Sequence, residues 1–300
     1  MLQTYDPRNA DILIHVNGAL LKRSDAKVSV FDSAVQGGDA VWEGLRVYNG
    51  GVMMLSRHLD RLQASAHALA FANVPSNEQI RQALFATLKA NGMSDGAHVR
   101  LTLTRGEKIT SGMDPRLNQK GCSLIVLAEW KPLVFDNATG IRVVTSSIRR
   151  MGPEVLDPKI HHNNLLNNIL AKIEANVAGA DGALMLDKNG HVAELNDINV
   201  FAIIKGEVVT PYTTSCLGGI TRALILELCA TNRIPCRERD LSVAELMNAD
   251  SVFGTGTMGE LTPIREIDGR AVGKSTGDGL LKRLQEIFRA AVPELCEAIV

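Results

Sequence analysis

The chain has 300 residues, 45% of them apolar, and a formal net charge of -1. This length and apolar content can bury one large core or two ordinary ones. A nearly neutral chain gives no reason to expect nucleic acid or an anionic membrane as partner, because both attract a concentrated basic face. Small molecules are therefore the expected ligands.

Five cysteines are scattered along the chain without the CxxC spacing of zinc or redox sites. The N-terminal residues, MLQTYDPRNADILIHV, carry charges where a signal peptide would have an apolar core. No stretch approaches the length of an apolar membrane span. We therefore expect reduced thiols, no membrane partner and a cytoplasmic location.

The first part of the chain predicts several strands followed by two helices. Asn17-Gly18 and Asn49-Gly50 each separate apolar runs, which is a strong hairpin signal. Apolar residues recur at helical spacing over 57–72, and Ser76 to Gln79 has the capping-box pattern of a helix that runs to residue 90. The predicted strands are 12–16, 19–21, 44–47, 52–55, 97–104 and 123–128.

A proline-containing loop over 129–137 is expected to join two domains. The second half then predicts a strand at 141–145, an Asn-rich helix at 165–178, hairpins at Asn189-Gly190 and Lys205-Gly206, and helices at 220–230, 241–247 and 279–291. Strands and helices are mixed without a regular βαβ order, so we predict an α+β fold rather than a doubly wound sheet.

Lys159 is the first candidate for chemistry, because it stands in DPKIHHNN ahead of an apolar helical run. A lysine with the ordinary pKa of about 10.4 is a poor nucleophile at neutral pH, so a lysine that forms a Schiff base must be desolvated or lie beside another cation. The alternative is a solvated surface lysine, as most lysines are. The neighbouring His161 and His162 point to different faces of a helix and no third ligand is evident, so we expect no metal site.

Glu194 is the second candidate. A carboxylate on the inward face of a strand needs a positive or hydrogen-bonding partner. A protonated pyridine nitrogen would be such a partner, and its protonation would make a cofactor an electron sink. An exposed glutamate on an edge strand is the alternative.

Two glycine-rich segments could bind phosphate. Gly218-Gly219-Ile220-Thr221 opens a predicted helix, whose free N–H groups suit an anion, and an ordinary turn is the alternative. Residues 254–259 match GxGxxG, but no helix of a βαβ unit follows, so a turn that serves one phosphate fits better than a dinucleotide site. Arg61, on the first predicted helix, would add charge-assisted bonds to a phosphate, although most helix arginines are solvated.

The order of these residues resembles the class IV, fold-type IV aminotransferases, which use pyridoxal 5'-phosphate. The resemblance covers nearly the whole chain and is carried by VWEGLR at 41–46, HLDRL at 58–62, Lys159, Glu194, GGITR at 218–222 and GTGTMGELTPI at 254–264. It implies a small N-terminal α/β domain (1–130), an interdomain loop (131–138) and a larger C-terminal cofactor-binding domain (139–300) with a twisted β core. It also implies a cofactor between the domains and a homodimer that completes each pocket.

The resemblance assigns roles by motif. Lys159 would form the internal aldimine and move a proton between the substrate α-carbon and the cofactor, and Glu194 would pair with the pyridine nitrogen. The phosphate group would be bound by Arg61, Gly219, Ile220, Thr221 and Thr257. The residues that would line the substrate pocket are Trp42, Gly44, Arg100, Thr257 and Met258.

The sequence also departs from the branched-chain members of the family. Asn163-Asn164 stands where many have Asn-Tyr, and Gly37 stands where they have another tyrosine. Gly38-Asp39 resembles D-amino-acid aminotransferases, whereas the EGLR motif and Arg100 resemble branched-chain enzymes. Arg100 and Arg105 are both candidates for the substrate carboxylate, but their odd spacing puts at most one of them in the pocket if the strand is regular.

We therefore expect transfer of the amino group of a branched-chain or similar apolar L-amino acid to 2-oxoglutarate. The alternatives are a D-amino-acid or (R)-amine transaminase, a lyase of the aminodeoxychorismate type, and a nicotinamide-dependent dehydrogenase that uses GTGTMG as its dinucleotide loop.

Overall fold

A computed structural model describes residues 4–273 and 278–299. It divides into two compact units. We call the first the N-terminal unit; it contains the residues up to Pro132 together with Ile160–Asn164 and the residues from Val292 onward. The C-terminal unit contains Leu133–Lys159 and Leu165–Ala291.

This division differs from the predicted one, in which a single loop at 131–138 separates the domains. Two later segments return to the N-terminal unit. Strand β16 (Cys296–Ala298) pairs with β4 (Gly51–Met53), and His162 forms a backbone bridge with Val41. Such long-range pairing has no local sequence signature, so the predicted C-terminal domain of 139–300 includes residues that belong to the other unit.

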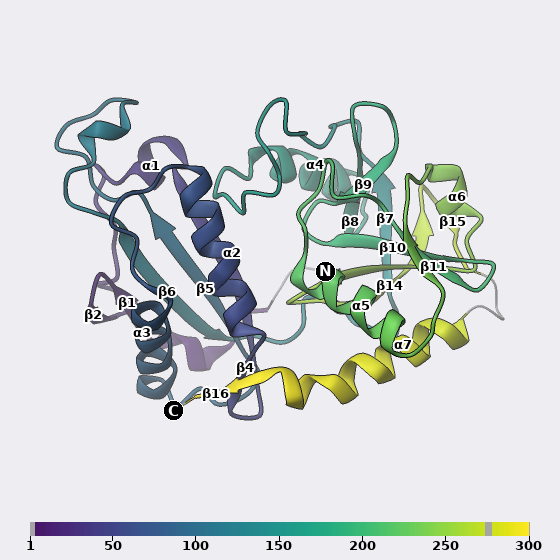
Figure 1. The fold of residues 1–300 in the computed structure, drawn as a ribbon, viewed down its shortest axis with the longest axis horizontal. Coiled ribbons are helices and arrows are strands. Elements are labelled where there is room, and N and C mark those ends of the chain that lie inside the picture. Colours follow the sequence, from purple (N-terminus) through teal and green to yellow (C-terminus); the bar gives the residue numbers. More distant parts are fainter. Residues whose placement is uncertain (1–3, 274–277, 300) are drawn as a thin grey trace. The chain divides into compact units, whose positions relative to one another are not determined.

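The N-terminal unit is built on a seven-stranded antiparallel sheet with the order β16-β4-β3-β5-β6-β1-β2 (Figure 1). Its other strands are β1 (Leu13–Val16), β2 (Ala19–Lys22), β3 (Ala40–Tyr48), β5 (Ala97–Thr104) and β6 (Ser123–Trp130). Its helices are α1 (Ser33–Gly37), α2 (Leu55–Ala68) and α3 (Asn77–Ala90), with 3-10 turns at Pro7–Ala10, Pro115–Leu117 and Val292–Leu295.

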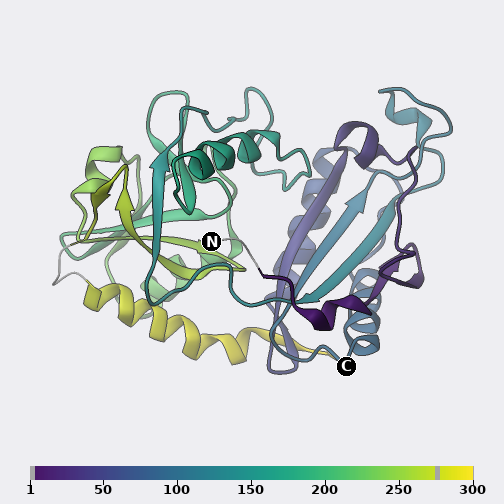
Figure 2. The same ribbon diagram turned by 180° about the vertical axis from the view of Figure 1, so that it is seen from behind.

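Helices α2 and α3 pack on the same face of this sheet, and Figure 2 shows β3, β5 and β6 side by side from the other face. On β3, Val41, Leu45 and Val47 are fully buried in the core with Leu59 and other helix residues. Because side chains alternate along a strand, Glu43 shares the helix-covered face of β3, while Trp42, Gly44 and Arg46 share the opposite face. This alternation sets the chemistry of both faces.

Local signals in this unit are largely confirmed. Asn17 and Gly18 have φ values of 49° and 90°, as a tight hairpin turn requires, and Ser76 and Gln79 form a capping box at the start of α3. Helix α2 ends at Ala68 rather than at the predicted residue 72, and Ala70 then takes a left-handed conformation with φ 53°. Residues 129 and 130, predicted as loop, continue strand β6.

The C-terminal unit contains a nine-stranded mixed sheet with the order β12-β11-β10-β13-β14-β7-β8-β9, and β15 pairs with β14 (Figure 1). Its strands are β7 (Ile141–Thr145), β8 (Gly182–Leu186), β9 (Val192–Leu195), β10 (Asn199–Ile204), β11 (Glu207–Thr210), β12 (Cys236–Glu238), β13 (Ser251–Gly256), β14 (Glu260–Ile267) and β15 (Arg270–Ala271). Its helices are α4 (Leu166–Val177), α5 (Ile220–Thr231), α6 (Val243–Met247) and α7 (Asp278–Ala291).

The segment that contains GxGxxG is a strand and a turn in the structure. Gly254 and Gly256 lie in β13, and the chain turns directly into β14, which pairs antiparallel with β13. Pro263 lies within β14, where it cannot donate to the ladder, and the pairing of β14 with β7 shifts register just after it, between Ile264 and Glu266. Since no helix follows the glycines, this segment is not a dinucleotide loop.

The predicted α+β class is confirmed by this mixture of strands and helices. The predicted helices at 165–178, 220–230, 241–247 and 279–291 correspond to α4 to α7. Within the described ranges, the structure has no helix of the length and apolar character needed to cross a membrane.

Candidate active site

Glu194 lies in β9 and is buried with three partners. Arg150 donates from Nε to Oε1 over 2.7 Å, and Asn199 donates from Nδ2 to Oε2 over 3.0 Å. The backbone N–H of Leu217 also donates to the carboxylate. Burial raises the pKa of Glu194, while the charge and hydrogen bonds of Arg150 act to lower it. The expectation that a buried strand carboxylate needs a positive partner is met here by Arg150.

Asn199 connects this carboxylate to the start of helix α5. Its Nδ2 also donates to the carbonyl of Leu217 over 2.9 Å, just before the glycine pair that opens the helix. A Cβ atom on Gly219 would lie 2.0 Å from Oδ1 of Asn199, so any other residue at this position would displace the Asn199 side chain. Gly219 is the N-cap of α5 and forms no side-chain cap, which leaves the first N–H groups, including those of Ile220 and Thr221, directed out of the helix end.

The end of strand β13 lies next to the same cluster. Thr255 pairs with Asn199 in the sheet, and Cβ atoms on Gly254 or Gly256 would lie 2.4 and 2.6 Å from the Ile198 side chain. The hydroxyl of Thr255 is buried and has no hydrogen-bond partner among the residues that the structure describes. Thr257 and Met258 follow in the partly buried turn into β14. The C-terminal unit therefore brings Glu194, Gly219 and the end of β13 together.

Lys159 lies in a turn at the end of the segment Leu133–Lys159 of this unit. Its side chain is 50% exposed, and its Nζ lies 2.9 Å from Oδ1 of Asp157, which also accepts a bond from the Lys159 N–H. This setting differs from the predicted one, because the side chain is half-exposed and its amine pairs with a carboxylate. The proline before Lys159 and the polar residues after it are arranged as a turn and a strand-like extension.

The residues that follow Lys159 are hydrogen-bonded to strand β3 in the N-terminal unit. The N–H of Trp42 donates to the His161 carbonyl over 3.0 Å, and the N–H of Asn163 donates to the Ala40 carbonyl over 2.7 Å. The indole N–H of Trp42 donates to the His162 carbonyl over 3.1 Å. The HHN part of the motif is therefore an extension of the sheet edge rather than the start of a helix.

The predicted substrate residues Trp42, Gly44 and Arg100 lie on one face of strands β3 and β5. Gly44 is paired with Arg100 across the strands, and the Arg100 guanidinium stacks 3.4 Å from the centroid of the Trp42 ring. Arg100 also donates to Oδ1 of Asn163 over 2.6 Å. Burial lowers the pKa of Arg100 to about 10. A Cβ on Gly44 would press against the rings of His98 and Trp42, at 3.3 and 3.4 Å.

Positive charge gathers on this face. Arg46 and His98 are paired across β3 and β5, and Arg46 donates to the carbonyl of Lys131. Burial, followed by the charges of Lys131, Arg46 and Arg100, lowers the pKa of His98 to about 3. The guanidinium groups of Arg46 and Arg100 therefore provide the positive charge of this face, and His98 between them is uncharged.

Arg105, the other candidate for the substrate carboxylate, has a structural role. It forms an ion pair with Asp39, with Nε 2.6 Å from Oδ2, and it donates to the carbonyls of Leu69 and Ala70 at the end of helix α2. A cation on the last carbonyls of a helix complements its dipole. The structure thus separates the two arginines: Arg100 lies within β5, whereas Arg105 lies just beyond the end of that strand.

Arg61 lies on helix α2 and is paired with the buried carboxylate of Glu43. Its Nε and Nη2 donate to Oε1 and Oε2 over 2.8 and 2.7 Å. His58 and His161 approach the same carboxylate, with Nδ1 atoms 2.6 and 3.1 Å away. The described residues contain no group of three or more His, Cys, Asp or Glu side chains that could hold a metal ion.

Several residues of these clusters were not assigned from the sequence, among them Arg150, Asn199, Glu43 and His98. Glu43 could have been found from the sequence. Side chains alternate along a strand, so Glu43 shares a face with the apolar residues Val41, Leu45 and Val47 and is expected to be buried. Nothing local distinguishes Arg150 from Arg149, or Asn199 from the other asparagines.

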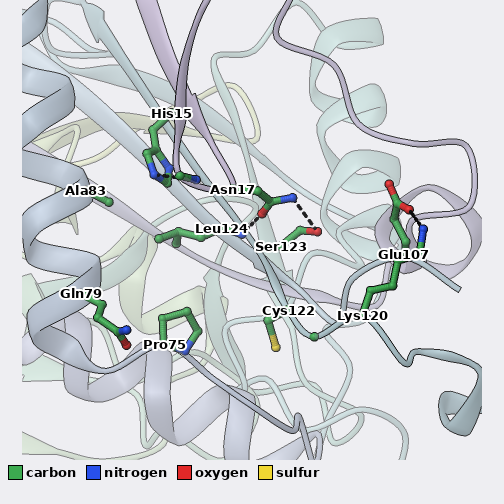
Figure 3. A pocket seen from close by; sticks show the side chains of 12 residues that line it. His15, Asn17, Pro75, Gln79, Ala83, Glu107, Lys120, Cys122, Ser123 and Leu124 are labelled. Carbon is green, nitrogen blue, oxygen red and sulfur yellow. Dashed lines mark hydrogen bonds and ion pairs between the residues drawn. The ribbon is translucent and has the colours of Figure 1, made fainter.

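The cavity in Figure 3 lies elsewhere in the N-terminal unit. It has a volume of about 560 Å³ and is lined by the β1–β2 hairpin, the start of α3 and the beginning of β6. Its Lys120 and Glu107 form an ion pair with each other at 2.7 Å, so their charges cancel. None of the predicted site residues lines this cavity.

Comparison with known proteins gives consistent matches. A profile described as amino-transferase class IV matches residues 40–267. Branched-chain-amino-acid aminotransferase-like protein 2 of Arabidopsis thaliana is 55% identical over 283 residues, which cover 94% of this chain and 51% of that protein. A putative branched-chain-amino-acid aminotransferase of Methanocaldococcus jannaschii is 39% identical over 277 residues, which cover 92% of this chain and 95% of that protein.

Solved structures that resemble this chain are also named as branched-chain aminotransferases. A T.th. branched-chain amino acid aminotransferase complexed with N-(5'-phosphopyridoxyl)-L-glutamate superposes with a TM-score of 0.89 at 31% identity, over 97% of this chain and 99% of that one. The chain spans about half the length of its two Arabidopsis relatives, at 51% of each.

Proposed function

Because the chain belongs to the class IV aminotransferase family, we propose that it is a pyridoxal-phosphate-dependent aminotransferase. The proposed reaction transfers the amino group of a branched-chain or similar apolar L-amino acid to 2-oxoglutarate. The observation that carries it is the cluster of Glu194, Arg150 and Asn199 beside the open end of helix α5.

The residues of the C-terminal unit fit the cofactor. Glu194 offers a buried carboxylate to a protonated ring nitrogen, and Arg150 favours its ionised form. The uncapped N-terminus of α5 and the unpartnered, buried hydroxyl at Thr255 suit a phosphate. We assign phosphate binding to Gly219, Ile220, Thr221 and Thr257, with Arg61 as a further cation. The neighbouring structure with a phosphopyridoxyl-glutamate ligand supports this choice.

Lys159 is the proposed catalytic base and acid. When bound, pyridoxal phosphate supplies an electron sink that stabilises negative charge at the substrate α-carbon. Lys159 would take the proton from the substrate α-carbon. It would then deliver this proton to the cofactor carbon that is attached to the substrate nitrogen. Its present partner, Asp157, must then release the amine, since a protonated lysine that donates to a carboxylate cannot accept a proton.

The substrate assignment rests on the face of β3 and β5. Arg100 is the proposed ligand of the substrate carboxylate, and Arg46 extends the positive face toward a second carboxylate, as 2-oxoglutarate has, while His98, with its pKa of about 3, is uncharged at neutral pH. Trp42 and Gly44 are the proposed apolar walls, with Met258 contributed by the turn before β14. The names of the relatives support the branched-chain assignment.

We further propose a homodimer. Helix α4 exposes an apolar stripe with the spacing of one helix face, and each of its side chains is at least 50% exposed: Leu166, Ile169, Leu170, Ile173 and Val177. A second copy of the chain would bury this stripe. Ile169→Glu with Ile173→Glu should then give a monomer in sedimentation, whereas Met113→Glu, at an exposed apolar residue away from this helix, should not. A reducing, cytoplasmic location is proposed because all five cysteines are free thiols.

A visible spectrum tests the central proposal. Purified protein supplied with pyridoxal phosphate should show the absorption band of the lysine-linked cofactor, and Lys159→Ala should lose it. Persistence of the band in Lys159→Ala, or its absence in the unaltered protein, would contradict the proposal. Release of 2-oxo acid from L-leucine, compared with D-alanine, tests the substrate, and activity on D-alanine alone would contradict the branched-chain assignment.

A further inference from the structure

A buried carboxylate with three basic partners lies between strand β3 and helix α2. Glu43 is 0% exposed, and both of its oxygens are engaged. Arg61 binds it with two parallel hydrogen bonds, while His58 and His161 lie at hydrogen-bond distance from Oε2 and Oε1. Burial by itself raises the pKa of Glu43, but the attraction of Arg61 and His161 outweighs this and holds the pKa well below its usual range. The cluster therefore contains a buried carboxylate that is ionised at neutral pH.

This charge is not needed to attach helix α2. The helix already packs on the sheet through Leu55, Leu59, Leu62 and Ala66, all fully buried. Apolar residues in place of a buried ion pair often stabilise a fold as well or better, so the presence of the pair calls for another reason. What an ion pair adds to apolar packing is a fixed orientation of the guanidinium.

The geometry shows how that orientation is set. Glu43 takes the edge of the guanidinium formed by Nε and Nη2. Because the five N–H donors of arginine form a rigid planar fork, fixing one edge also fixes the direction of the other edge, at Nη1. An anion that meets a preoriented fork does not have to order the long side chain on binding.

We propose that Glu43 is a positioning residue that holds the Arg61 guanidinium in one orientation for binding the cofactor phosphate. The proposal rests on the proposed function, in which Arg61 is a phosphate ligand. The same carboxylate lies 3.1 Å from His161 Nδ1, and His161 follows Lys159 by two positions. One buried charge therefore fixes both the phosphate-binding arginine and the segment that continues from the catalytic lysine.

The test compares the affinities of the purified protein for pyridoxal phosphate and for pyridoxal, which lacks the phosphate. Affinity is read from the change in tryptophan fluorescence, so no turnover is needed. Glu43→Gln should weaken pyridoxal phosphate binding about tenfold and leave pyridoxal binding unchanged. Arg61→Gln should do the same, and the double variant should be no weaker than Arg61→Gln alone. Glu78→Gln removes the more exposed pair with Arg81 and serves as the matched control.

Each outcome has a distinct meaning. If Arg61→Gln binds pyridoxal phosphate as well as the unaltered protein does, the phosphate role of Arg61 in the proposed function is wrong. If Arg61→Gln weakens binding and Glu43→Gln does not, only the positioning role is wrong. If Glu43→Gln weakens the binding of pyridoxal phosphate and of pyridoxal equally, the substitution damages the protein in general, and the positioning role of Glu43 is also wrong.

A folding failure of Glu43→Gln does not end the test. The double variant leaves neither buried charge unpaired, and urea unfolding shows whether it folds. In the double variant, the ratio of the affinities for pyridoxal phosphate and pyridoxal should equal the ratio in Arg61→Gln. A further loss of affinity for pyridoxal phosphate alone would show that Glu43 does not act through Arg61.

Discussion

Arg150 donates from Nε to Oε1 of Glu194 over 2.7 Å, and each side chain is only 6% exposed. Burial raises the pKa of Glu194, so the carboxylate depends on Arg150 for its charge. We predict that Arg150→Leu, which leaves the carboxyl without a cation, lowers the free energy of unfolding by about 3–5 kcal/mol. Urea unfolding followed by circular dichroism measures this change.

The control for this prediction removes an exposed ion pair. Lys120→Met breaks the pair with Glu107 and should leave the urea midpoint unchanged. Arg150→Leu combined with Glu194→Gln should recover most of the lost stability, because no unpaired charge remains buried. A single Arg150→Leu variant as stable as the unaltered protein would show that Glu194 does not need this partner.

Gly219 and Gly218 make a matched pair for a steric test. A methyl group on Gly219 would collide with Asn199 Oδ1, whereas a methyl group on Gly218 would meet nothing within 4 Å. We predict that Gly219→Ala costs about 1–3 kcal/mol of stability and weakens pyridoxal phosphate binding, because Asn199 must leave Glu194 or Leu217. Gly218→Ala should change neither quantity. Equal effects of the two substitutions on titration with the cofactor would contradict the steric account.

The sequence predicted those features that have a local or chemical signature. The capping box at Ser76, the hairpin at Asn17-Gly18 and the need of Glu194 for a positive partner all follow from short-range rules. The identity of that partner could not be predicted from the sequence, because Arg150 is 44 positions away from Glu194. Only the packing of the folded chain distinguishes Arg150 from Arg149. For the same reason the return of β16 to the N-terminal sheet was missed.

Lys159 shows a second limit. Its motif led to a specific chemical role, but the physical setting inferred for that role, a desolvated amine, is not what the structure shows. Motifs report what a residue does in related chains, whereas the exposure of one side chain depends on contacts that a motif does not contain. The asparagines after Lys159 illustrate the point, since Asn163 contacts Arg100 and Asn167 contacts Arg150.

Arg100 and Arg105 should differ in what their loss affects. Arg100→Met removes the proposed ligand of the substrate carboxylate, and one charge-assisted interaction of about 1.5–3 kcal/mol corresponds to roughly a 10–150-fold fall in kcat/KM. Arg105→Met instead breaks the pair with Asp39 and uncaps α2, so it should lower the urea midpoint and have the smaller kinetic effect. Steady-state kinetics and urea unfolding of both variants test this prediction. If Arg105→Met has the larger effect on kcat/KM and Arg100→Met the larger effect on the urea midpoint, the two roles are reversed.

His161 makes stability depend on pH. Burial lowers its pKa from 6.5 to about 4 and outweighs the attraction of Glu43. Between these values the unfolded chain takes up a proton that the folded chain does not, so stability is full above pH 6.5 and falls as the pH approaches 4. At about 1.4 kcal/mol per pKa unit, the loss is on the order of 3 kcal/mol. Glu43, whose pKa is held low, adds a further loss in acid with the same sign.

Urea unfolding from pH 8 to pH 4 measures this dependence. His161→Gln cannot titrate, so its stability should fall less steeply with decreasing pH between about 6.5 and 4. The exposed His67, on the same helix as Arg61, provides the control, and His67→Gln should keep the slope of the unaltered protein. If His161→Gln keeps that slope as well, the proton taken up in acid belongs to another group, and the buried cluster around Glu43 does not set the acid limit of the fold.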